Sequence, residues 1–515
     1  MNFLKNITPR EYQKKILETC TKKNCLVVLP TGLGKTLIAL MLTIKRMEEF
    51  PGEKVVFLAP TKPLAEQHLN SFKKYLPELF GEMQLFTGKI NAKKREKIWK
   101  TADIIFSTPQ CVANDIRKKL YNLNEVCLLI EDEAHRCIKN YDYNYIAQIY
   151  QKQATNQRLV GLTASPGSET SKIKDICRNL SIEEVELRTR ESEDVKNYLQ
   201  KIEYEKIMLD FPPELEEVKH VLLKLFDRYI EEIKLRRIFL TNPSKIGLIE
   251  LQKKISATLA RGNNNFNYML GASACAQAIK IQHALELLET QTLFSFNKYI
   301  KELFNQAAKK QSKGIIKLVN KPEFNFIFMR SSELLIKNFE HPKVQELIEI
   351  IKREKIKKDK TKIIVFTQFR DTATLISKRL NEIEGINAKT FVGQTKKGES
   401  GLSQKEQKEI IEEFSSGKIN VLCATCIAEE GLDIPEVDAV IFYEPVASAI
   451  RKIQRAGRTA RLMKGKIIML ITKKTRDEYY FYASRAREKK MHTAINSIKE
   501  DLSNGIKFDV QKTLK

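Results

Sequence analysis

A glycine-rich segment near the N-terminus has the residue types and the spacing of a phosphate-binding loop. It lies between an apolar run at 25–29 and a helical pattern at 37–47, and it comprises Pro30, Thr31, Gly32, Leu33, Gly34, Lys35 and Thr36. The two glycines allow backbone N–H groups to wrap around phosphates at the start of a helix, where the helix dipole adds positive potential. Lys35 would reach the β- and γ-phosphates, and the Thr36 hydroxyl would bind Mg²⁺. The segment predicts an ATP and Mg²⁺ site; a purely structural turn is the alternative, because Leu29 stands where the strict pattern has glycine.

A pair of carboxylates follows another apolar run. The run at 126–130 ends in Glu131-Asp-Glu-Ala-His135, at the carboxyl edge of a predicted parallel strand, where ligands of such folds bind. Asp132 is predicted to hold Mg²⁺, and Glu133 to orient and deprotonate the attacking water. An acidic helix cap after a buried strand is the alternative, and the presence of the phosphate loop argues against it.

Arginines near the C-terminus could supply charge to a transferring phosphoryl group. Arg455, Arg458 and Arg461 recur at three-residue spacing after Gln454, which places them on one face of a helix. We predict that Gln454, Arg458 and Arg461 act in catalysis from a second domain, with the arginines as an arginine finger, so that hydrolysis requires the two domains to close. A stripe of surface or nucleic-acid-binding arginines is the alternative.

Two sets of short apolar runs must position these residues. The first set lies at 25–29, 55–58, 104–106, 126–130 and 159–162, and the second at 363–366, 421–423, 439–442 and 467–471. Each run is continuously apolar, as in parallel strands that are covered by helices on both faces. Between the two sets, stretches such as 214–239 and 271–308 have apolar residues at helical spacing. The sequence predicts an α/β fold with parallel-sheet domains at 1–195 and 341–515 and an all-helical domain inserted at 196–340.

The charge balance predicts a polyanionic partner. Lys and Arg number 89 against 64 Asp and Glu, which gives a formal net charge of +25. The bias is stronger over 234–321, where 15 Lys or Arg stand against 4 Glu, and we predict that Lys253, Lys254 and Arg261 contact phosphates. A solvated helix face is the alternative for each single residue.

Other compositional features indicate where in the cell the protein is expected to work and whether it carries disulfides or a zinc site. No apolar stretch approaches the ~20 residues of a membrane span, and no secretory signal is visible, so we expect an intracellular protein without a membrane partner. The nine cysteines are dispersed along the chain, which indicates reduced core thiols rather than disulfides. Cys423 and Cys426 form a pair, but no second pair completes a zinc site.

These elements, in this order, resemble the motif set of superfamily 2 helicases, and they run from about 10 to 461, nearly the whole chain. The resemblance implies two RecA-like domains that use ATP and Mg²⁺, and it assigns further roles residue by residue. By this resemblance, Gln13 would contact the adenine base. His135, Thr163 and Ser165 would couple the nucleotide site to the nucleic acid. The residues that would contact the nucleic-acid backbone are Thr61, Lys62, Thr108 and Thr425. Those that would contact the nucleotide are Gly431 and Asp433.

The chain combines the motif Asp-Glu-Ala-His with a helical domain between two core domains. In this it resembles the branch of superfamily 2 that contains Hef and FANCM and also includes the double-stranded RNA sensors and Dicer. The segments 161–166 and 475–480 are most similar to Hef, whereas Ala460 departs from the family's glycine. The resemblance implies an ATP-dependent DNA helicase or translocase that unwinds or remodels forked and branched DNA in replication-fork repair, with the insert gripping duplex. No motif of an XPF-type nuclease is present, so the expected partners besides DNA are a separate nuclease subunit or a sliding clamp. The expected location is the nucleoid of an archaeal cell.

Other functions stay open at this point. One is a double-stranded RNA-dependent ATPase or translocase of the RNA-sensor and Dicer branch, and another is a nucleic-acid binder with a vestigial ATP site. The complete set of charged residues in the predicted ATP site argues against the vestigial site, and an ATPase that needs no nucleic acid is less supported still. His68, His283 and His341 show no ligand spacing and are predicted to be ordinary structural histidines.

Overall fold

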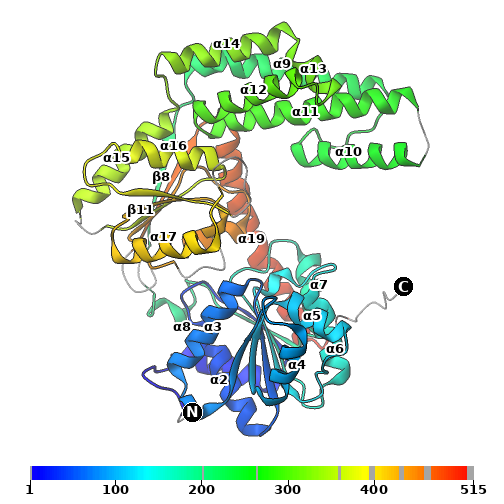
Figure 1. Ribbon diagram of the computed structural model, residues 1–515, viewed down its shortest axis with the longest axis vertical. Helices are drawn as coiled ribbons and strands as arrows, with labels where there is room; N and C mark the ends of the chain where they lie inside the picture. Colours follow the sequence, from blue (N-terminus) through cyan, green and yellow to red (C-terminus); the bar gives the residue numbers. More distant parts are fainter. Residues whose placement is uncertain are drawn as a thin grey trace.

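Two parallel-sheet domains and a helical domain make up the computed structural model (Figure 1). The structure describes residues 3–199, 202–261, 265–357, 361–393, 401–428, 434–457, 465–506 and 508. In Figure 1 the helical domain lies at the top, the second sheet domain below it on the left, and the first sheet domain at the bottom. The predicted fold class is confirmed. None of the described helices has the length and apolar character needed to cross a membrane.

The first sheet has seven parallel strands in the order β3-β4-β2-β5-β6-β1-β7. Their bounds are β1 Cys25–Val28, β2 Lys54–Leu58, β3 Met83–Phe86, β4 Ile104–Ser107, β5 Val126–Asp132, β6 Leu159–Thr163 and β7 Glu184–Leu187. The five central strands match the five predicted apolar runs. The edge strands β3 and β7 escaped prediction because each is four residues long and only half of its residues are buried.

Helices cover both faces of the first sheet, as continuously apolar strands require. They are α1 Glu11–Lys22, α2 Lys35–Glu49, α3 Lys62–Tyr75, α4 Ala92–Thr101, α5 Pro109–Arg117, α6 Asp142–Gln153, α7 Thr170–Asn179 and α8 Glu193–Lys196, with 3-10 turns η1 Glu78–Phe80 and η2 Ala134–Arg136. One core cluster joins α1, α2 and α3 to one face of the sheet. A second cluster on the other face joins α4, α5, α6 and α7.

In the described part of the chain, the second sheet has six parallel strands in the order β10-β11-β9-β12-β13-β8. Its strands are β8 Ile202–Leu209, β9 Ile363–Phe366, β10 Ala388–Phe391, β11 Val421–Ala424, β12 Ala439–Phe442 and β13 Gly465–Thr472. The accompanying helices are α15 Pro342–Lys357, α16 Arg370–Leu380, α17 Gln404–Ser416, α18 Ala449–Ala456 and α19 Arg476–Ser503, with the 3-10 turn η3 Cys426–Ala428. Four of the six strands match the predicted runs.

Strand β8 corrects the prediction of a wholly helical segment at 196–340. All eight of its residues pair with β13, so the chain adds a strand to the second sheet before it enters the helical domain. Its sequence, Ile-Glu-Tyr-Glu-Lys-Ile-Met-Leu, is half polar, because an edge strand needs apolar residues on fewer sides than a central strand. Because of these polar residues, the sequence pattern did not predict the strand. The helices of this segment begin only at Pro213.

Among the described residues, six helices form the helical domain, which lies between the two sheet domains in sequence. They are α9 Pro213–Leu235, α10 Lys245–Ala260, α11 Phe266–Thr290, α12 Leu293–Ala308, α13 Lys313–Val319 and α14 Pro322–Ile336. Their apolar faces meet in a separate core cluster that includes Leu222, Phe226, Ile281 and Phe296. The helical domain therefore buries its own core and packs as a unit.

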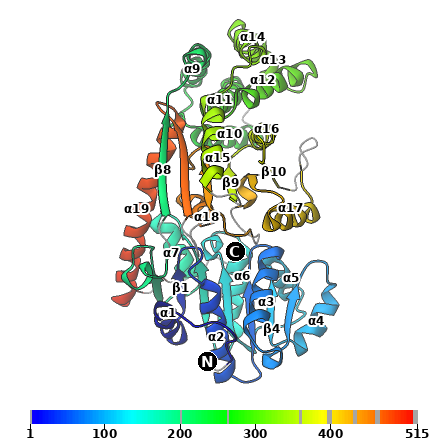
Figure 2. The ribbon, with the colours of Figure 1, turned by 90° about the vertical axis from the view of Figure 1, so that its left-hand side faces the viewer.

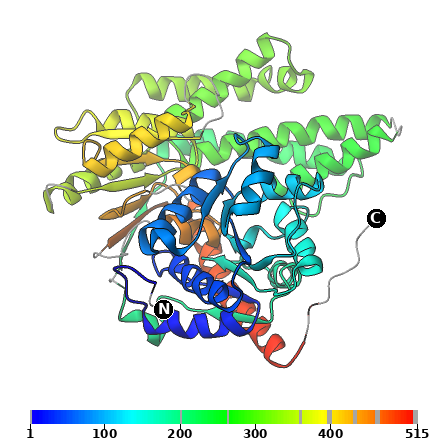
Figure 3. The ribbon, with the colours of Figure 1, turned by 60° about the horizontal axis from the view of Figure 1, so that its bottom comes forward.

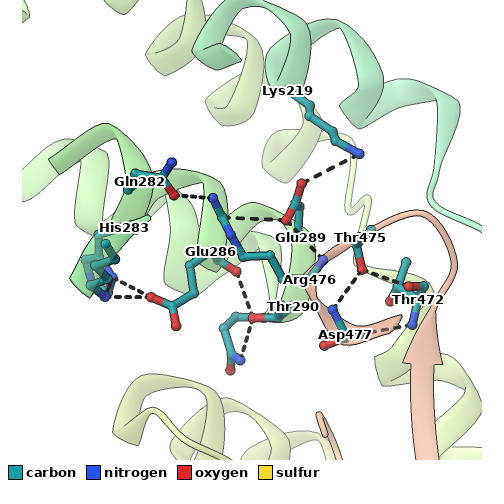
Figure 4. Close-up of polar contacts among 12 residues, drawn as sticks. Lys219, Gln282, His283, Glu286, Glu289, Thr290, Thr472, Thr475, Arg476 and Asp477 are labelled. Carbon is teal, nitrogen blue, oxygen red and sulfur yellow. Dashed lines mark hydrogen bonds and ion pairs between the residues drawn. The ribbon is translucent and has the colours of Figure 1, made fainter. Parts of the chain in front are cut away.

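A polar network fixes the helical domain to the second sheet domain (Figure 4). Glu289 of α11 accepts ion pairs from Lys219 of α9 and Arg476 of α19, at 3.6 and 3.5 Å. Beside it, the ammonium group of Lys343 in α15 forms a fully buried ion pair with Asp477 and donates to the Thr290 carbonyl at 3.1 Å. Charges that are paired across these four helices hold them in one arrangement.

Helix α19 spans from this network to the first domain, as Figures 1, 2 and 3 show in red. Near its start, Phe481 packs in the second domain, whereas Met491, Ile495 and Ile498 complete a core of the first domain. An ion pair at 2.9 Å joins Lys174 of α7 to Asp501 near the end of the helix. The two sheet domains are therefore linked by one continuous helix.

Candidate nucleotide site and nucleic-acid interface

The predicted phosphate loop joins β1 to α2 and has the backbone of such a loop. Gly32 and Gly34 have φ values of 84° and 77°, the left-handed region that favours glycine. Gly34 also leaves space for the side chain of Gln13, because a Cβ atom on Gly34 would stand 2.4 Å from Gln13 Nε2. Helix α2 begins at Lys35, so its free backbone N–H groups face the loop. The loop can bind an anion at the helix N-terminus.

Leu29, the residue that departs from the strict pattern, does not impair the loop. Its side chain is fully buried in the core beneath α2. Its backbone carbonyl accepts a hydrogen bond of 2.9 Å from Lys35 Nζ. The lysine is thus held at the mouth of the loop, where a phosphate group could replace that carbonyl as its partner.

The predicted adenine contact lies next to the loop. Gln13 Nε2 donates to the Leu33 carbonyl at 3.1 Å, and its Oε1 accepts from the Arg10 N–H at 2.9 Å. Tyr12 donates its hydroxyl to the same Leu33 carbonyl at 2.8 Å. A cavity of about 380 Å³ opens here, lined by Ile7, Thr8, Arg10, Gln13, Gly32, Leu33, Gly34, Thr36, Leu37, Leu40, Ser71 and Tyr75. Its volume falls in the range of small-molecule sites, and it joins the Gln13 side to the phosphate loop.

Both predicted metal ligands face one histidine. Asp132 ends β5, and its Oδ2 lies 2.8 Å from Nε2 of His68, whose Nδ1 lies 3.4 Å from Thr36 Oγ1. Burial alone would raise the pKa of Asp132, but the hydrogen bond and charge of His68 and the charge of Lys35 lower it. A carboxylate and a hydroxyl beside a phosphate loop are oxygen ligands suited to Mg²⁺. Bound there with nucleotide, Mg²⁺ would neutralise charge on the phosphates.

The predicted base and coupling residues form a connected series. Glu133 has a left-handed backbone, with φ of 52°, and its carboxylate lies 3.2 Å from Nδ1 of His135. The same His135 nitrogen lies 3.3 Å from Thr163 Oγ1 at the end of β6. Thr163 Oγ1 in turn accepts from the Ser165 N–H at 3.1 Å, and the Ser165 hydroxyl donates to Met491 Sδ at 2.9 Å. The series leads from the predicted catalytic carboxylate to α19.

The second domain meets the phosphate loop at the end of α18. A Cβ atom on Gly457 would stand 1.5 Å from Thr31 Oγ1, so the Thr31 side chain lies directly against the Gly457 backbone. Beside this contact, Thr31, Ile453, Gly457 and Met491 help to line a cavity of about 440 Å³ between the domains. Gln454 lies buried in the same helix. Arg458 and Arg461 follow directly but lie outside the described residues, as do Gly431 and Asp433, so their roles stay predictions.

Arg455 requires a correction. The sequence placed it on one helical face with Arg458 and Arg461, as an arginine offered to the nucleotide. It is instead fully buried, with its guanidinium carbon 5.0 Å from the centroid of the Phe366 ring in β9. A cation over an aromatic face inside the core stabilises the domain rather than reaching a ligand. The face of α18 that carries Arg455 packs on the sheet.

The predicted contacts to a nucleic-acid backbone lie at strand ends. Thr61 precedes α3 and Thr108 precedes α5, at the carboxyl ends of the paired strands β2 and β4. The hydroxyl oxygen of Thr61 is buried and has no hydrogen-bond partner among the described residues. Lys62 begins α3 beside it, and Thr425 follows the carboxyl end of β11 in the second sheet. These positions suit the prediction, and their contacts stay predictions.

The three basic residues predicted in the helical domain lie on α10. Lys253 and Lys254 are exposed on this helix, and Arg261 is exposed directly after its end. Their charges are available to a polyanion.

Sequence reasoning missed His68, which it took for an ordinary structural histidine. The available signal is its place on α3, where Ala65, His68, Leu69 and Phe72 are buried at helical spacing. That spacing turns His68 toward the sheet, but only the packing of α3 over β3 and β4, with the His68 ring on Phe57 of β2, brings it to Asp132.

Three family models match the chain: DEAD/DEAH box helicase at 10–173, "Putative ATP-dependent RNA helicase, helical bundle" at 214–333, and Helicase conserved C-terminal domain at 342–463. Among solved structures the chain is similar to the Pyrococcus furiosus Hef helicase domain. The two share 40% identity with a TM-score of 0.70, and the match covers 94% of this chain and 100% of that one.

Curated relatives give the same assignment. The chain is 37% identical to the "Putative ATP-dependent RNA helicase MJ1505" of Methanocaldococcus jannaschii, over 96% of this chain and 61% of the relative. It is 33% identical to the ATP-dependent DNA helicase mph1 of Neurospora crassa, over 91% of this chain and 41% of the relative. The chain thus spans between 41% and 61% of the length of these two relatives. It belongs to the DEAD/DEAH box helicases, in the branch of Hef and Mph1.

Proposed function

We propose that this chain is an ATP- and Mg²⁺-dependent helicase or translocase that unwinds or remodels forked and branched DNA in replication-fork repair. The observation that carries the proposal is the meeting of both sheet domains at one nucleotide site, where Gly457 abuts Thr31 of the phosphate loop. A site assembled from two bodies makes hydrolysis depend on their relative position, which is how such a motor converts turnover into movement.

The chemistry follows from the residues around that site. Lys35 and the loop N–H groups bind the phosphates, Thr36 and Asp132 hold Mg²⁺, and Glu133 orients the attacking water. The second domain supplies Gln454, Arg458 and Arg461 when the domains close. Because Glu133 leads through His135 and Thr163 to Ser165 and α19, hydrolysis is coupled to the position of the second domain.

DNA is the proposed substrate. Supporting this choice are the formal charge of +25, the exposed Lys253, Lys254 and Arg261 on the helical domain, and the name of the Neurospora crassa relative, a DNA helicase. The helical domain is proposed to grip duplex beside the motor domains. Further proposed partners are a separate nuclease subunit or a sliding clamp, and the proposed location is the nucleoid of an archaeal cell.

Double-stranded RNA is the second candidate substrate, because the Methanocaldococcus jannaschii relative and the helical-bundle family model are both named for an RNA helicase. A vestigial site is the less supported reading, since the predicted site keeps the charged residues Lys35, Asp132 and Glu133.

Strand separation tests the proposal. A fluorescently labelled fork, a linear DNA duplex of the same sequence and the matching RNA duplex would each be incubated with the chain, Mg²⁺ and ATP, with Glu133→Gln as the blank. We expect the fork to be processed fastest and the blank to leave it intact. If the chain processed only the RNA duplex, double-stranded RNA would replace DNA as its proposed substrate. If it processed none of the three, the proposal would be overturned.

A further inference from the structure

His68 occupies a position between the two predicted metal ligands. Its ring nitrogens lie 2.8 Å from Asp132 Oδ2 and 3.4 Å from Thr36 Oγ1. The side chain is 8% exposed and packs on Phe57, with ring centroids 4.4 Å apart. The ring is therefore held in place by the core of the first domain, and it cannot turn away from either ligand without leaving that contact.

Hydrogen-bond chemistry fixes which atom donates. An ionised carboxylate only accepts, so His68 Nε2 carries the proton and donates it to Asp132. When Nε2 alone carries a proton, Nδ1 accepts, and the Thr36 hydroxyl is then the donor to it. That arrangement turns the lone pairs of the Thr36 oxygen away from the ring and leaves Asp132 Oδ1 free of the histidine. Both oxygen atoms can then serve a cation.

We propose that His68 is a positioning residue for the Mg²⁺ ion that accompanies the nucleotide, an inference that rests on the proposed ATP site. It sets the spacing and the orientation of the Thr36 hydroxyl and the Asp132 carboxylate, without itself binding the metal or the nucleotide. Partners that orient metal ligands in this way typically change metal affinity by about 10–100-fold when they are removed.

The ring comes from α3, the helix that begins beside Thr61 and Lys62, the predicted contacts to the nucleic-acid backbone. Asp132 and Thr36 come from β5 and α2. His68 is therefore the group through which a third element of the first domain reaches the metal ligands. A shift of α3 changes their spacing directly.

Nucleotide binding as a function of Mg²⁺ tests the proposal without relying on turnover. The full chain would be titrated with a fluorescent, non-hydrolysable ATP analogue at a series of Mg²⁺ concentrations and in EDTA. We expect His68→Ala to raise the Mg²⁺ concentration for half-maximal binding by roughly tenfold or more. Its affinity for the analogue in EDTA should stay within about twofold of the wild type, because the phosphate loop is untouched.

Two further variants sharpen the result. His68→Gln can still donate an amide proton to Asp132, so it should recover part of the Mg²⁺ dependence, and it keeps the test available if the alanine variant does not fold. His220→Ala removes an exposed histidine of α9 and should match the wild type.

The outcomes separate this inference from the proposed function. Unchanged Mg²⁺ dependence in both His68 variants would overturn the positioning role, and so would an equal loss of affinity with and without Mg²⁺, which indicates general damage to the loop. Absence of analogue binding by the wild-type chain would instead overturn the ATP site itself.

Discussion

Gly457 of the second domain lies against Thr31 of the phosphate loop so closely that a Cβ atom on Gly457 would stand 1.5 Å from the Thr31 hydroxyl oxygen. The φ value of Gly457 is −69°, which any residue can adopt, so space rather than backbone freedom makes glycine necessary here. Because α18 leads directly into Arg458 and Arg461, this contact sets how far the second domain can approach the nucleotide.

Substitution Gly457→Ala is therefore expected to hold the domains apart. We expect ATP turnover in the presence of DNA to fall roughly tenfold or more, which corresponds to about 1.4 kcal/mol in the barrier. Thermal unfolding should change little, because the added methyl group meets the other domain. The matched control is Gly314→Ala, where the nearest atoms are at ordinary contact distances of 3.6 Å or more. Equal turnover in Gly457→Ala and the control would contradict the role of this contact.

Neutralising Lys253, Lys254 and Arg261 together is expected to weaken DNA binding and to flatten its salt dependence. Each lost phosphate contact lowers the slope of log affinity against log salt by about 0.9. ATP turnover without DNA should stay unchanged, because α10 is remote from the nucleotide site. Fluorescence anisotropy at several salt concentrations measures both effects.

The control for that variant neutralises Lys378, Lys389 and Lys418, which are exposed near the amino ends of β10 and β11, the edge opposite Thr425. If the α10 variant keeps the wild-type slope of log affinity against log salt, Lys253, Lys254 and Arg261 do not belong to the DNA interface.

The buried pair of Lys343 and Asp477 is expected to be a main support of the junction with the helical domain. Both side chains are 0% exposed, so Lys343→Met would leave a buried carboxylate without its partner. That change should lower the free energy of unfolding by roughly 3–5 kcal/mol, and a second change, Asp477→Leu, should recover much of the loss. Lys298→Met breaks the exposed pair with Asp371 and should cost about 1 kcal/mol or less. Chemical denaturation compares the variants, and equal losses at the two lysines would refute the buried role.

Stability should depend on pH through Glu444. Burial raises the pKa of Glu444 to about 7, against partial lowering by the charges of Lys343 and Arg455, whereas its ordinary value is 4.5. Between these values the folded chain keeps a proton that the unfolded chain has lost, so stability falls as pH rises from 4.5 to about 7. The total change is roughly 3 kcal/mol.

Glu444→Gln should remove this dependence while keeping an acceptor for the N–H of Gln368. Thermal unfolding at pH 5, 6 and 7 measures it, with Glu413→Gln, an exposed position on α17, as the control. Parallel pH curves for wild type and Glu444→Gln would show that the carboxyl group is not the cause.

The sequence was most informative where chemistry fixes local geometry. The loop from Pro30 to Thr36 requires glycine at set positions whatever surrounds it, and the carboxylates after 126–130 follow from the end of a buried strand. Continuous apolar runs likewise predicted the central strands of both sheets, because burial on two faces leaves no room for polar residues.

Features that depend on packing between distant segments were not predictable in the same way. Strand β8 carries charged residues because it lies at an edge, and its partner β13 lies over 250 residues later. Arg455 has the spacing of a finger residue, but the sheet beneath α18 buries it over Phe366. His68 gains its role only because α3 packs over the sheet, with the His68 ring on Phe57 of β2. Each depends on a contact that no local pattern records.

ATP turnover with forked DNA tests the central claim most directly. The wild-type chain and Glu133→Gln would be compared with no nucleic acid, forked DNA, linear duplex DNA and double-stranded RNA, in Mg²⁺. A motor for branched DNA predicts strong stimulation by the fork, weaker stimulation by the linear duplex, and loss of both in Glu133→Gln. Turnover that is indifferent to every nucleic acid, or equal in the Glu133→Gln chain, would contradict it.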